Sequence, residues 1–238
     1  MDGEVNPRTL AIDIGGTGLK MEVIDVNGQP LTQRARVVTP HPAKPAAVLA
    51  ALKGLLANQG TFDRVSAGFP GVVVEGVTKT APNLHPSWRD FNLADALREM
   101  TGRPVHVAND ADVQGYGDIE GQGVEMVLTL GTGLGSAVYV DGRLLPNLEL
   151  GHQPFDRGQT YEERIGKAAL DSVGPKRWRK RVLQVVRQLE PIWNYRLLYL
   201  GGGNARLLHK AELPANVRIA SNQAGLLGGI ALWQDRGR

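Results

Sequence analysis

Apolar residues at alternating and helical spacings divide the first half of the chain into short elements. In order, the pattern predicts strands at 9–14, 19–24 and 36–38, a helix around 48–56, a strand at 65–69, a helix at 93–100 and a strand at 105–108. The first three strands form a meander, so we expect a sheet that is partly antiparallel. The first half is therefore of the α/β class.

The second half begins with the same pattern. It predicts strands at 126–130 and 136–140 about a glycine turn at 131–135, helical stretches at 161–169 and 175–189, a strand at 197–200 and a last helix at 222–233. Strand, glycine turn and strand thus occur twice. This repetition indicates a duplicated fold with a cleft between two related halves.

Composition narrows the chemistry that is available to the protein. The 238 residues include no cysteine, which excludes disulfides, thiolate metal ligands and thiol nucleophiles. The first eight residues have no signal-peptide pattern, and nowhere do about 18 apolar residues follow one another. We therefore expect a soluble cytoplasmic protein with no membrane partner.

The net charge of +3 hides an asymmetry between the halves. Residues 1–150 carry 12 Lys and Arg against 17 Asp and Glu, whereas residues 151–238 carry 15 against 7. Much of the excess lies in one run around Trp178: Lys176, Arg177, Arg179, Lys180 and Arg181. The run is either the solvated face of a helix with Trp178 packed inward, or a surface for a polyanion beside an exposed aromatic ring.

Two glycine turns are candidates for holding phosphate, because glycine lets backbone N–H groups approach phosphate oxygens. The first includes Gly15, Gly16 and Thr17, and the second Gly131, Thr132 and Gly133. Neither has the lysine spacing of a P-loop. Asp13 adds a carboxylate where Mg²⁺ and phosphate would meet, and Lys20 adds a positive charge. The alternative is a pair of structural hairpins.

Polar residues at the ends of predicted elements are candidates for the chemistry. Asn109 and Asp110 follow the strand at 105–108, where a helix begins, so they can cap that helix or bind a ligand at the carboxyl end of the strand. Glu149 and His152 flank Gly151 and can both face one small polar ligand. A zinc site is the competing interpretation, but one Glu and one His fall short of the usual ligand set.

Together these segments resemble the ROK family of sugar kinases, in particular its polyphosphate glucokinase branch. The resemblance rests on six segments in the order of the family: 13–18, 68–71, 109–112, 131–135, 149–152 and 201–203. It implies an actin-like ATPase (ribonuclease H-like) fold with two lobes around a central cleft, and a homodimer. We place one lobe at 1–108, with a helix at 222–238 packed back onto it, and the other at 109–221.

The resemblance also implies roles for single residues. Asp110 corresponds to the catalytic base. The residues that correspond to sugar ligands are Asn83, Asn109, Glu149, His152 and Glu162. The donor phosphates would contact the two glycine turns, with Asp13 and Lys20, and a third turn that includes Gly201 and Gly202.

Two departures from the wider family bear on the donor and on nucleic acid. Many members carry a cysteine-rich zinc loop after the Glu-x-Gly-His segment, whereas residues 153–160 replace it here. DNA-binding members carry an N-terminal helix-turn-helix, and only about eight residues precede the first strand here. We therefore expect a Mg²⁺-dependent glucokinase that uses polyphosphate, with ATP as the alternative donor. A sugar sensor without activity and a nucleic-acid-binding module are the remaining alternatives.

Overall fold

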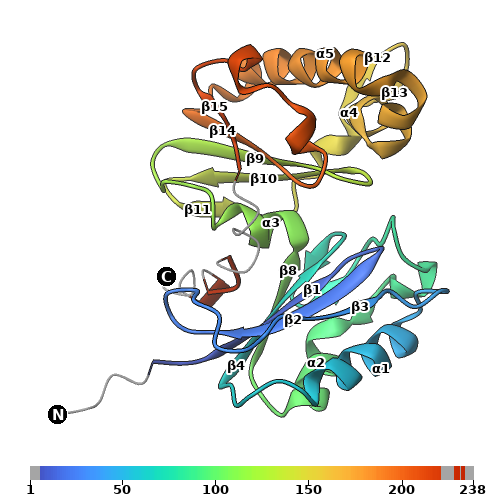
Figure 1. Ribbon diagram of the computed structural model, residues 1–238, viewed down its shortest axis with the longest axis vertical. Coiled ribbons are helices and arrows are strands. Elements are labelled where there is room, and N and C mark those ends of the chain that lie inside the picture. Colours follow the sequence, from blue (N-terminus) through green and yellow to red (C-terminus); the bar gives the residue numbers. More distant parts are fainter. Residues whose placement is uncertain (1–5, 221–227, 231, 234–238) are drawn as a thin grey trace. The chain divides into compact units, whose positions relative to one another are not determined.

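The computed structural model of the protein describes residues 6–220, 228–230, 232 and 233. Contacts between Cα atoms group the chain into two compact units, Met1–Gln114 with Gly225–Arg238, and Gly115–Ala224. Each unit is built on a five-stranded sheet with helices packed against it (Figure 1).

The sheet of the first unit has the order β3-β2-β1-β4-β8. Its strands are β1 Thr9–Ile14, β2 Gly18–Ile24, β3 Ala35–Val38, β4 Arg64–Phe69 and β8 Val105–Asn109. β1, β4 and β8 are parallel, while β2 and β3 are antiparallel to their neighbours. The carboxyl ends of the three parallel strands therefore meet at one edge of the sheet, which is the usual edge for ligand sites.

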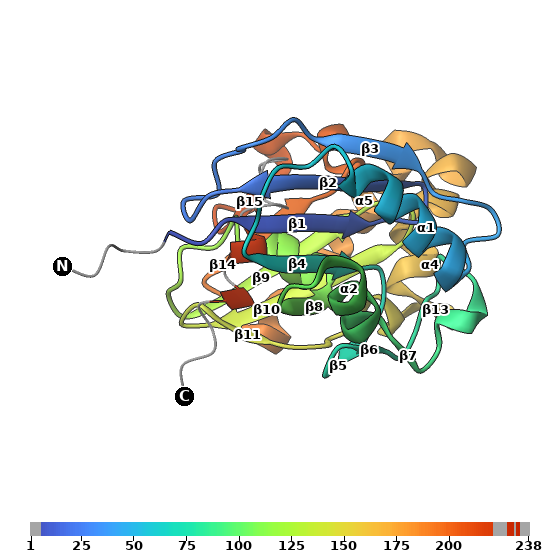
Figure 2. The ribbon, with the colours of Figure 1, turned by 90° about the horizontal axis from the view of Figure 1, so that it is seen from below.

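Two helices, α1 Pro45–Leu56 and α2 Leu93–Thr101, pack on one face of this sheet (Figure 2). Leu10 and Ile12 of β1 face them, whereas Ala11 contacts Ile230 on the other face, as the alternation of side chains along a strand requires. A short helix, α3 Asp110–Gly115, begins directly after β8. A small sheet of β5 Val73–Val74, β6 Val77–Thr78 and β7 Phe91–Asn92 lies beside the 3₁₀ helix η1 Pro86–Trp88.

The second unit repeats the plan with the order β11-β10-β9-β14-β15. Its strands are β9 Val124–Leu130, β10 Leu134–Val140, β11 Arg143–Leu145, β14 Leu197–Gly201 and β15 Val217–Ile219. Here β9, β14 and β15 are parallel, and β10 and β11 are antiparallel to their neighbours. The two sheets share strand order and direction, which confirms the duplication expected from the two glycine turns.

Helices and a hairpin complete the second unit. They are η2 Leu150–His152, β12 Pro154–Asp156, β13 Gln159–Thr160, α4 Tyr161–Ile165, α5 Lys167–Trp193, η3 Ala205–Leu207 and η4 Lys210–Glu212. The apolar face of α5, with Trp178 and Val182, packs on Met126 and Leu128 of the sheet. Gly174 has φ 75° and kinks α5 just before Pro175, a residue suited to the first turn of a helix.

Most predicted elements lie within two residues of those in the structure, but the helix expected at 161–169 is wrong. Gly166 is extended there and separates α4 from α5. A Cβ at Gly166 would lie 2.8 Å from the carbonyl oxygen of Glu162, so the close approach favours glycine. The sequence pattern did not predict β5 to β7, β11 to β13 or β15, which have only two or three residues each.

The helix expected at 222–238 falls largely outside the described residues. Of that segment the structure describes 228–230, 232 and 233, all helical. Trp233 donates an Nε1–H hydrogen bond of 2.9 Å to Ser66 Oγ in β4, and its ring lies against His106 of β8. These residues therefore contact the sheet of the first unit.

Candidate functional site

The first glycine turn joins β1 and β2 and is held by backbone and threonine contacts. The N–H of Gly15 donates to the carbonyl oxygen of Gly18 at 3.0 Å, and Thr39 Oγ1 donates to the carbonyl oxygen of Gly15 at 2.6 Å. A Cβ at Gly15 would lie 2.9 Å from that Gly18 oxygen, so the turn is too tight for a side chain there. Thr39 thus fixes a turn that the sequence identified without this residue.

Asp13 and Lys20 are brought together as opposite residues of β1 and β2. Lys20 Nζ lies 2.7 Å from Asp13 Oδ2, and both side chains are partly exposed. No cluster of three or more Asp, Glu, His or Cys suited to a metal occurs among the residues the structure describes. Mg²⁺ commonly takes only one or two protein carboxylates and completes its shell with water and substrate phosphates. Asp13 fits such a role, with Lys20 as a competing partner.

Asn109 and Asp110 lie at the junction of β8 and α3. Asn109 is buried; its Nδ2 donates to the carbonyl oxygen of Gly71, and its Oδ1 accepts from the N–H of Ala111 at 2.8 Å. Asp110 Oδ1 accepts from the same N–H at 2.8 Å and the residue is half-buried. The cap expected of Asn109 is therefore present, and Asp110 contacts the same N–H at the start of α3.

Asn83 lies beside the first glycine turn, although 66 positions separate it from Thr17. A Cβ at Gly16 would meet the carbonyl oxygen of Asn83 at 3.2 Å and its Cβ at 3.3 Å. The structure thus brings Asn83 to the turn rather than leaving it on a remote loop. Its backbone helps to shape the space over Gly16.

In the second unit, the Glu162 side chain contacts the second glycine turn. Its Oε2 accepts from the N–H of Leu134 at 2.9 Å, and a Cβ at Gly133 would collide with that carboxylate. Lys167, at the start of α5, donates its N–H to the carbonyl oxygen of Thr132 at 3.0 Å. Glu162 therefore touches the turn predicted for phosphate and lies near Gly151, between the predicted sugar ligands Glu149 and His152.

Glu149, His152 and Glu162 form one cluster of titratable groups. Burial raises the pKa of Glu149 above its ordinary 4.5, while His152 opposes the rise and the Glu162 carboxylate adds to it. Ser136 holds the segment: its Oγ donates to the carbonyl oxygen of Leu148 and accepts from the N–H of Leu150 at 3.0 Å. A half-buried carboxylate and an exposed imidazole can accept or donate hydrogen bonds to a polyhydroxyl ligand.

The third glycine turn packs against the second. Gly202 has φ 81°, and a Cβ there would lie 2.6 Å from the carbonyl oxygen of Leu130. Asn204 donates its N–H to the same oxygen at 2.9 Å and its Nδ2–H to the carbonyl oxygen of Gly131 at 3.0 Å. The carboxyl ends of β9 and β14 thus carry both turns side by side.

The basic run does not have the exposed aromatic ring that one interpretation required. Trp178 is fully buried and donates its Nε1–H to the carbonyl oxygen of Ile165 at 2.7 Å. Lys176, Arg177 and Lys180 are exposed, while Arg179 and Arg181 are half-buried. Stacking of a base on Trp178 is therefore excluded, because the ring fills the core, and the inward-packed alternative is confirmed.

Three residues that shape the site are absent from the residues predicted from the sequence: Thr39, Ser136 and Asn204. Two of these residues could have been predicted from their position in the sequence. Ser136 directly follows the second glycine turn, and Asn204 directly follows the three glycines at 201–203. Thr39 could not, because its contact with Gly15 spans 24 positions and depends on how β3 pairs with β2.

Glu149→Gln is expected to raise the melting temperature at neutral pH. The raised pKa means that the folded state binds a proton more tightly than the unfolded state does, so the resulting stability is present below 4.5 and is lost as pH rises through the folded pKa. The difference in melting temperature between variant and wild type should therefore grow as pH rises from 4.5, as thermal unfolding at a series of pH values would measure.

The exposed Glu99→Gln is the control and should show no such trend. A variant that melts below wild type at pH 7 would contradict the prediction, because local partners would then outweigh burial.

The chain is similar to a known protein family and to characterised relatives. The model of the ROK family matches residues 9–166. Polyphosphate glucokinase of Mycobacterium tuberculosis (strain ATCC 25618 / H37Rv) is 35% identical over 235 residues, covering 91% of this chain and 88% of the relative.

Solved structures of sugar kinases share the fold of this chain. The inorganic polyphosphate/ATP-glucomannokinase from Arthrobacter sp. strain KM is 32% identical, with a TM-score of 0.87 over 96% of this chain and all of that one. A ROK family glucokinase from Streptomyces griseus, in complex with glucose and AMPPNP, is 21% identical, with a TM-score of 0.76 over 94% of this chain and 98% of that one. The predicted actin-like ATPase fold is thereby confirmed, and the chain belongs to the ROK family.

Proposed function

We propose that the protein is a glucokinase that transfers the terminal phosphoryl group of inorganic polyphosphate to the 6-hydroxyl of glucose. One observation carries the proposal: Glu162 contacts the second glycine turn and belongs to the same cluster as Glu149 and His152. Groups suited to sugar hydroxyls thus lie beside a turn suited to phosphate. The names of the relatives from Mycobacterium tuberculosis and Arthrobacter support this choice of acceptor and donor.

In this proposal the acceptor side consists of polar side chains. Glu149 and Glu162 would accept hydrogen bonds from sugar hydroxyls, and His152 would donate or accept one. Asn109 and Asn83 would contribute amides from the first unit. In this proposal Asp110 accepts the proton of the 6-hydroxyl as that oxygen attacks the terminal phosphorus in line.

The donor side uses mainly backbone. N–H groups of the turns that contain Gly15, Gly131 and Gly202 would surround phosphate oxygens, and Lys20 would add a positive charge. Mg²⁺, bound through Asp13 and the donor phosphates, would neutralise charge that develops on the transferred group. The charge of residues 151–238, 15 Lys and Arg against 7 Asp and Glu, favours a polyanionic donor.

A second donor and acceptor have a specific observation in their favour. The Arthrobacter enzyme is named as a polyphosphate/ATP-glucomannokinase, so ATP and mannose are the alternatives for this chain. A coupled assay of the purified protein with glucose or mannose, Mg²⁺, and polyphosphate or ATP tests all four combinations. We expect the highest kcat/KM with glucose and polyphosphate, and loss of activity when EDTA removes Mg²⁺.

The same assay separates the other classes of function. Sugar binding without turnover of either donor would establish a sensor and overturn the proposal. Activity with ATP alone would reject polyphosphate as the donor.

The proposal also includes a homodimer in the cytoplasm. Light scattering coupled to size-exclusion chromatography would test the dimer. No helix among the described residues is long and apolar enough to span a membrane.

A further inference from the structure

One face of α5 presents polar side chains along several turns. Arg177, Arg181, Gln184 and Gln188 follow one another at intervals of three or four residues, with Arg187 beside them. The opposite face holds the buried residues that pack on the sheet. The polar face is therefore continuous from the basic run toward the end of the helix.

The structure divides the basic run between two sides of α5. Arg179 turns toward η3 and η4: its Nη1 donates to the carbonyl oxygen of Leu207 at 3.4 Å, and its Nε lies 4.0 Å from Glu212. Arg181 instead donates to the carbonyl oxygen of Arg164 in α4 at 3.3 Å. Arg179 and Arg181 therefore lie on different sides of α5.

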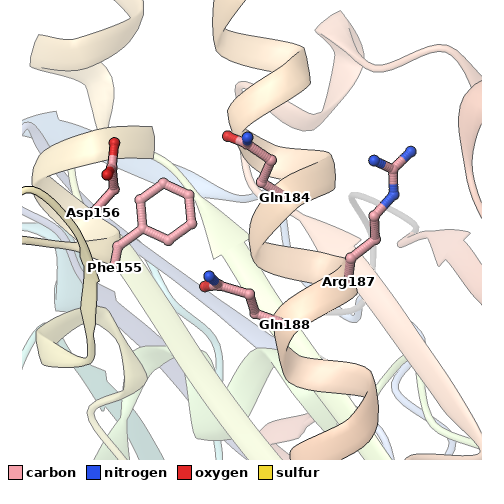
Figure 3. A pocket seen from close by; sticks show the side chains of 5 residues that line it. All are labelled: Phe155, Asp156, Gln184, Arg187 and Gln188. Atoms are coloured by element: carbon pink, nitrogen blue, oxygen red, sulfur yellow. The ribbon is translucent and has the colours of Figure 1, made fainter.

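A pocket of about 420 Å³ lies between α5 and the β12–β13 hairpin (Figure 3). Gln184, Arg187 and Gln188 line it from α5, while Phe155 and Asp156 line it from the β12–β13 hairpin. Within the part of the chain that the structure describes, neither the two glutamine amides nor the Arg187 guanidinium makes a hydrogen bond or an ion pair. Their donors are thus available to a ligand.

The charge around this pocket is unbalanced. Burial lowers the pKa of Arg181, and the positive charges of Arg164 and Arg177 lower it further, with Asp156 as the opposing charge. Asp156 already pairs with Arg164, whose Nη2 lies 3.0 Å from Oδ2. The guanidinium groups of Arg164, Arg177 and Arg181 therefore have Asp156 as their opposing charge, and such crowding favours an anion.

Short connections link this surface to the second glycine turn. Glu162 contacts Gly133, and Arg164 is two residues further along α4. α4 has five residues, a length of roughly 7.5 Å. A chain of phosphates that begins at the turn needs only a few repeats to reach Arg164.

We propose that Arg164, Arg177, Arg181 and Arg187, with Gln184 and Gln188, bind the distal phosphates of a linear polyphosphate donor. We call this set the α5 anion face. The inference rests on the proposed function. It adds a binding place for the distal part of the donor, away from the phosphate that is transferred. The face supplies fixed forks of donors for phosphate oxygens, which arginine matches better than lysine.

A nucleic acid fits the face less well. Single strands are bound by a basic groove together with aromatic rings on which successive bases stack. Phe155 is the aromatic ring that lines the pocket, and it already packs on Tyr161, with ring centroids 5.5 Å apart, and against the Arg164 guanidinium. A polyanion without bases is therefore the better match.

The test compares donors of different length in the variant Arg177→Gln/Arg181→Gln/Arg187→Gln. With long-chain polyphosphate its KM should rise about tenfold at low salt, and the slope of log KM against log salt should fall by about 2, since each lost phosphate contact removes roughly 0.7. With tripolyphosphate or ATP, which are too short to extend past Arg164 to the three substituted arginines, KM should stay unchanged.

A second variant guards against misfolding, because Arg181 contacts the backbone of α4. Arg177→Gln/Arg187→Gln changes two exposed side chains and should show the same pattern, with a smaller change. The matched control, Lys53→Gln/Arg103→Gln/Arg143→Gln, removes three exposed charges elsewhere and should leave the KM for long chains unchanged.

The outcomes separate this inference from the function on which it rests. If wild type uses ATP and no polyphosphate, the proposed donor is wrong. If wild type uses long chains and the variants have the same KM for them, the α5 anion face is wrong. An equal loss with all three donors would also overturn it, as would tight displacement of long-chain polyphosphate by single-stranded DNA.

Discussion

Asp110→Asn is expected to lower kcat by about 10²- to 10⁴-fold, while the Kd for sugar changes little. This loss corresponds to roughly 3–5 kcal/mol of barrier. The physical reason is that an amide cannot accept the proton of the attacking hydroxyl, whereas its oxygen can still accept the N–H of Ala111 as Asp110 Oδ1 does at 2.8 Å. Steady-state kinetics with saturating donor, together with sugar binding by calorimetry, would measure both quantities.

The matched control is Glu99→Gln, an exposed carboxylate on α2 of the same unit, which should leave kcat unchanged. Melting temperatures of both variants should lie close to that of wild type, so that a loss of activity is not a loss of folding. Full activity of Asp110→Asn would remove Asp110 as the base. A large rise in the Kd for sugar at unchanged kcat would make it a binding residue instead.

The largest effect on stability is expected at Glu125, a fully buried carboxylate at the start of β9. It accepts hydrogen bonds from three consecutive N–H groups, those of Glu120, Gly121 and Gln122, at 2.6–3.0 Å. It also pairs with Arg196 at 3.0 Å and accepts from Tyr199 at 3.1 Å. Burial, together with the Glu125 charge, raises the pKa of Tyr199 to about 12.

Glu125→Ala should therefore lower the free energy of unfolding by about 3–5 kcal/mol, because it leaves buried donors without an acceptor. Urea denaturation measures the change. Glu120→Gln removes an exposed carboxylate that contacts the same Arg196 and should cost little. Similar losses for the two variants would mean that the ion pairs at the surface, rather than the buried hydrogen bonds, hold the segment at 116–124.

Much of the fold could be predicted from the sequence because the signals are local. The strands at 9–14 and 197–200 are continuous apolar runs, and Gly102 ends α2 in a left-handed conformation that glycine adopts without strain. Strands β5, β6 and β7 could not be predicted, because a strand of two residues has no periodicity to detect.

Some candidate site residues have a local sequence signal, and others depend on contacts between distant parts of the chain. The glycine turns and the Asn109-Asp110 pair carry their chemistry in adjacent positions, so the sequence predicts them directly. Thr39 holds the first glycine turn and Ser136 holds the segment around Glu149, through contacts that span 24 and at least 12 positions, which no local pattern encodes. The contact of Glu162 with Gly133 likewise depends on where α4 packs.

By itself, then, the sequence determined the duplicated α/β plan and the three glycine turns, since each depends on neighbours along the chain. The residues that bind sugar or phosphate stay a prediction. Only the tertiary structure decided that Trp178 is a core residue and that Arg179 and Arg181 face different sides of α5. Helical spacing fixes which residues share a face, but which face is buried depends on the sheet against which the helix packs.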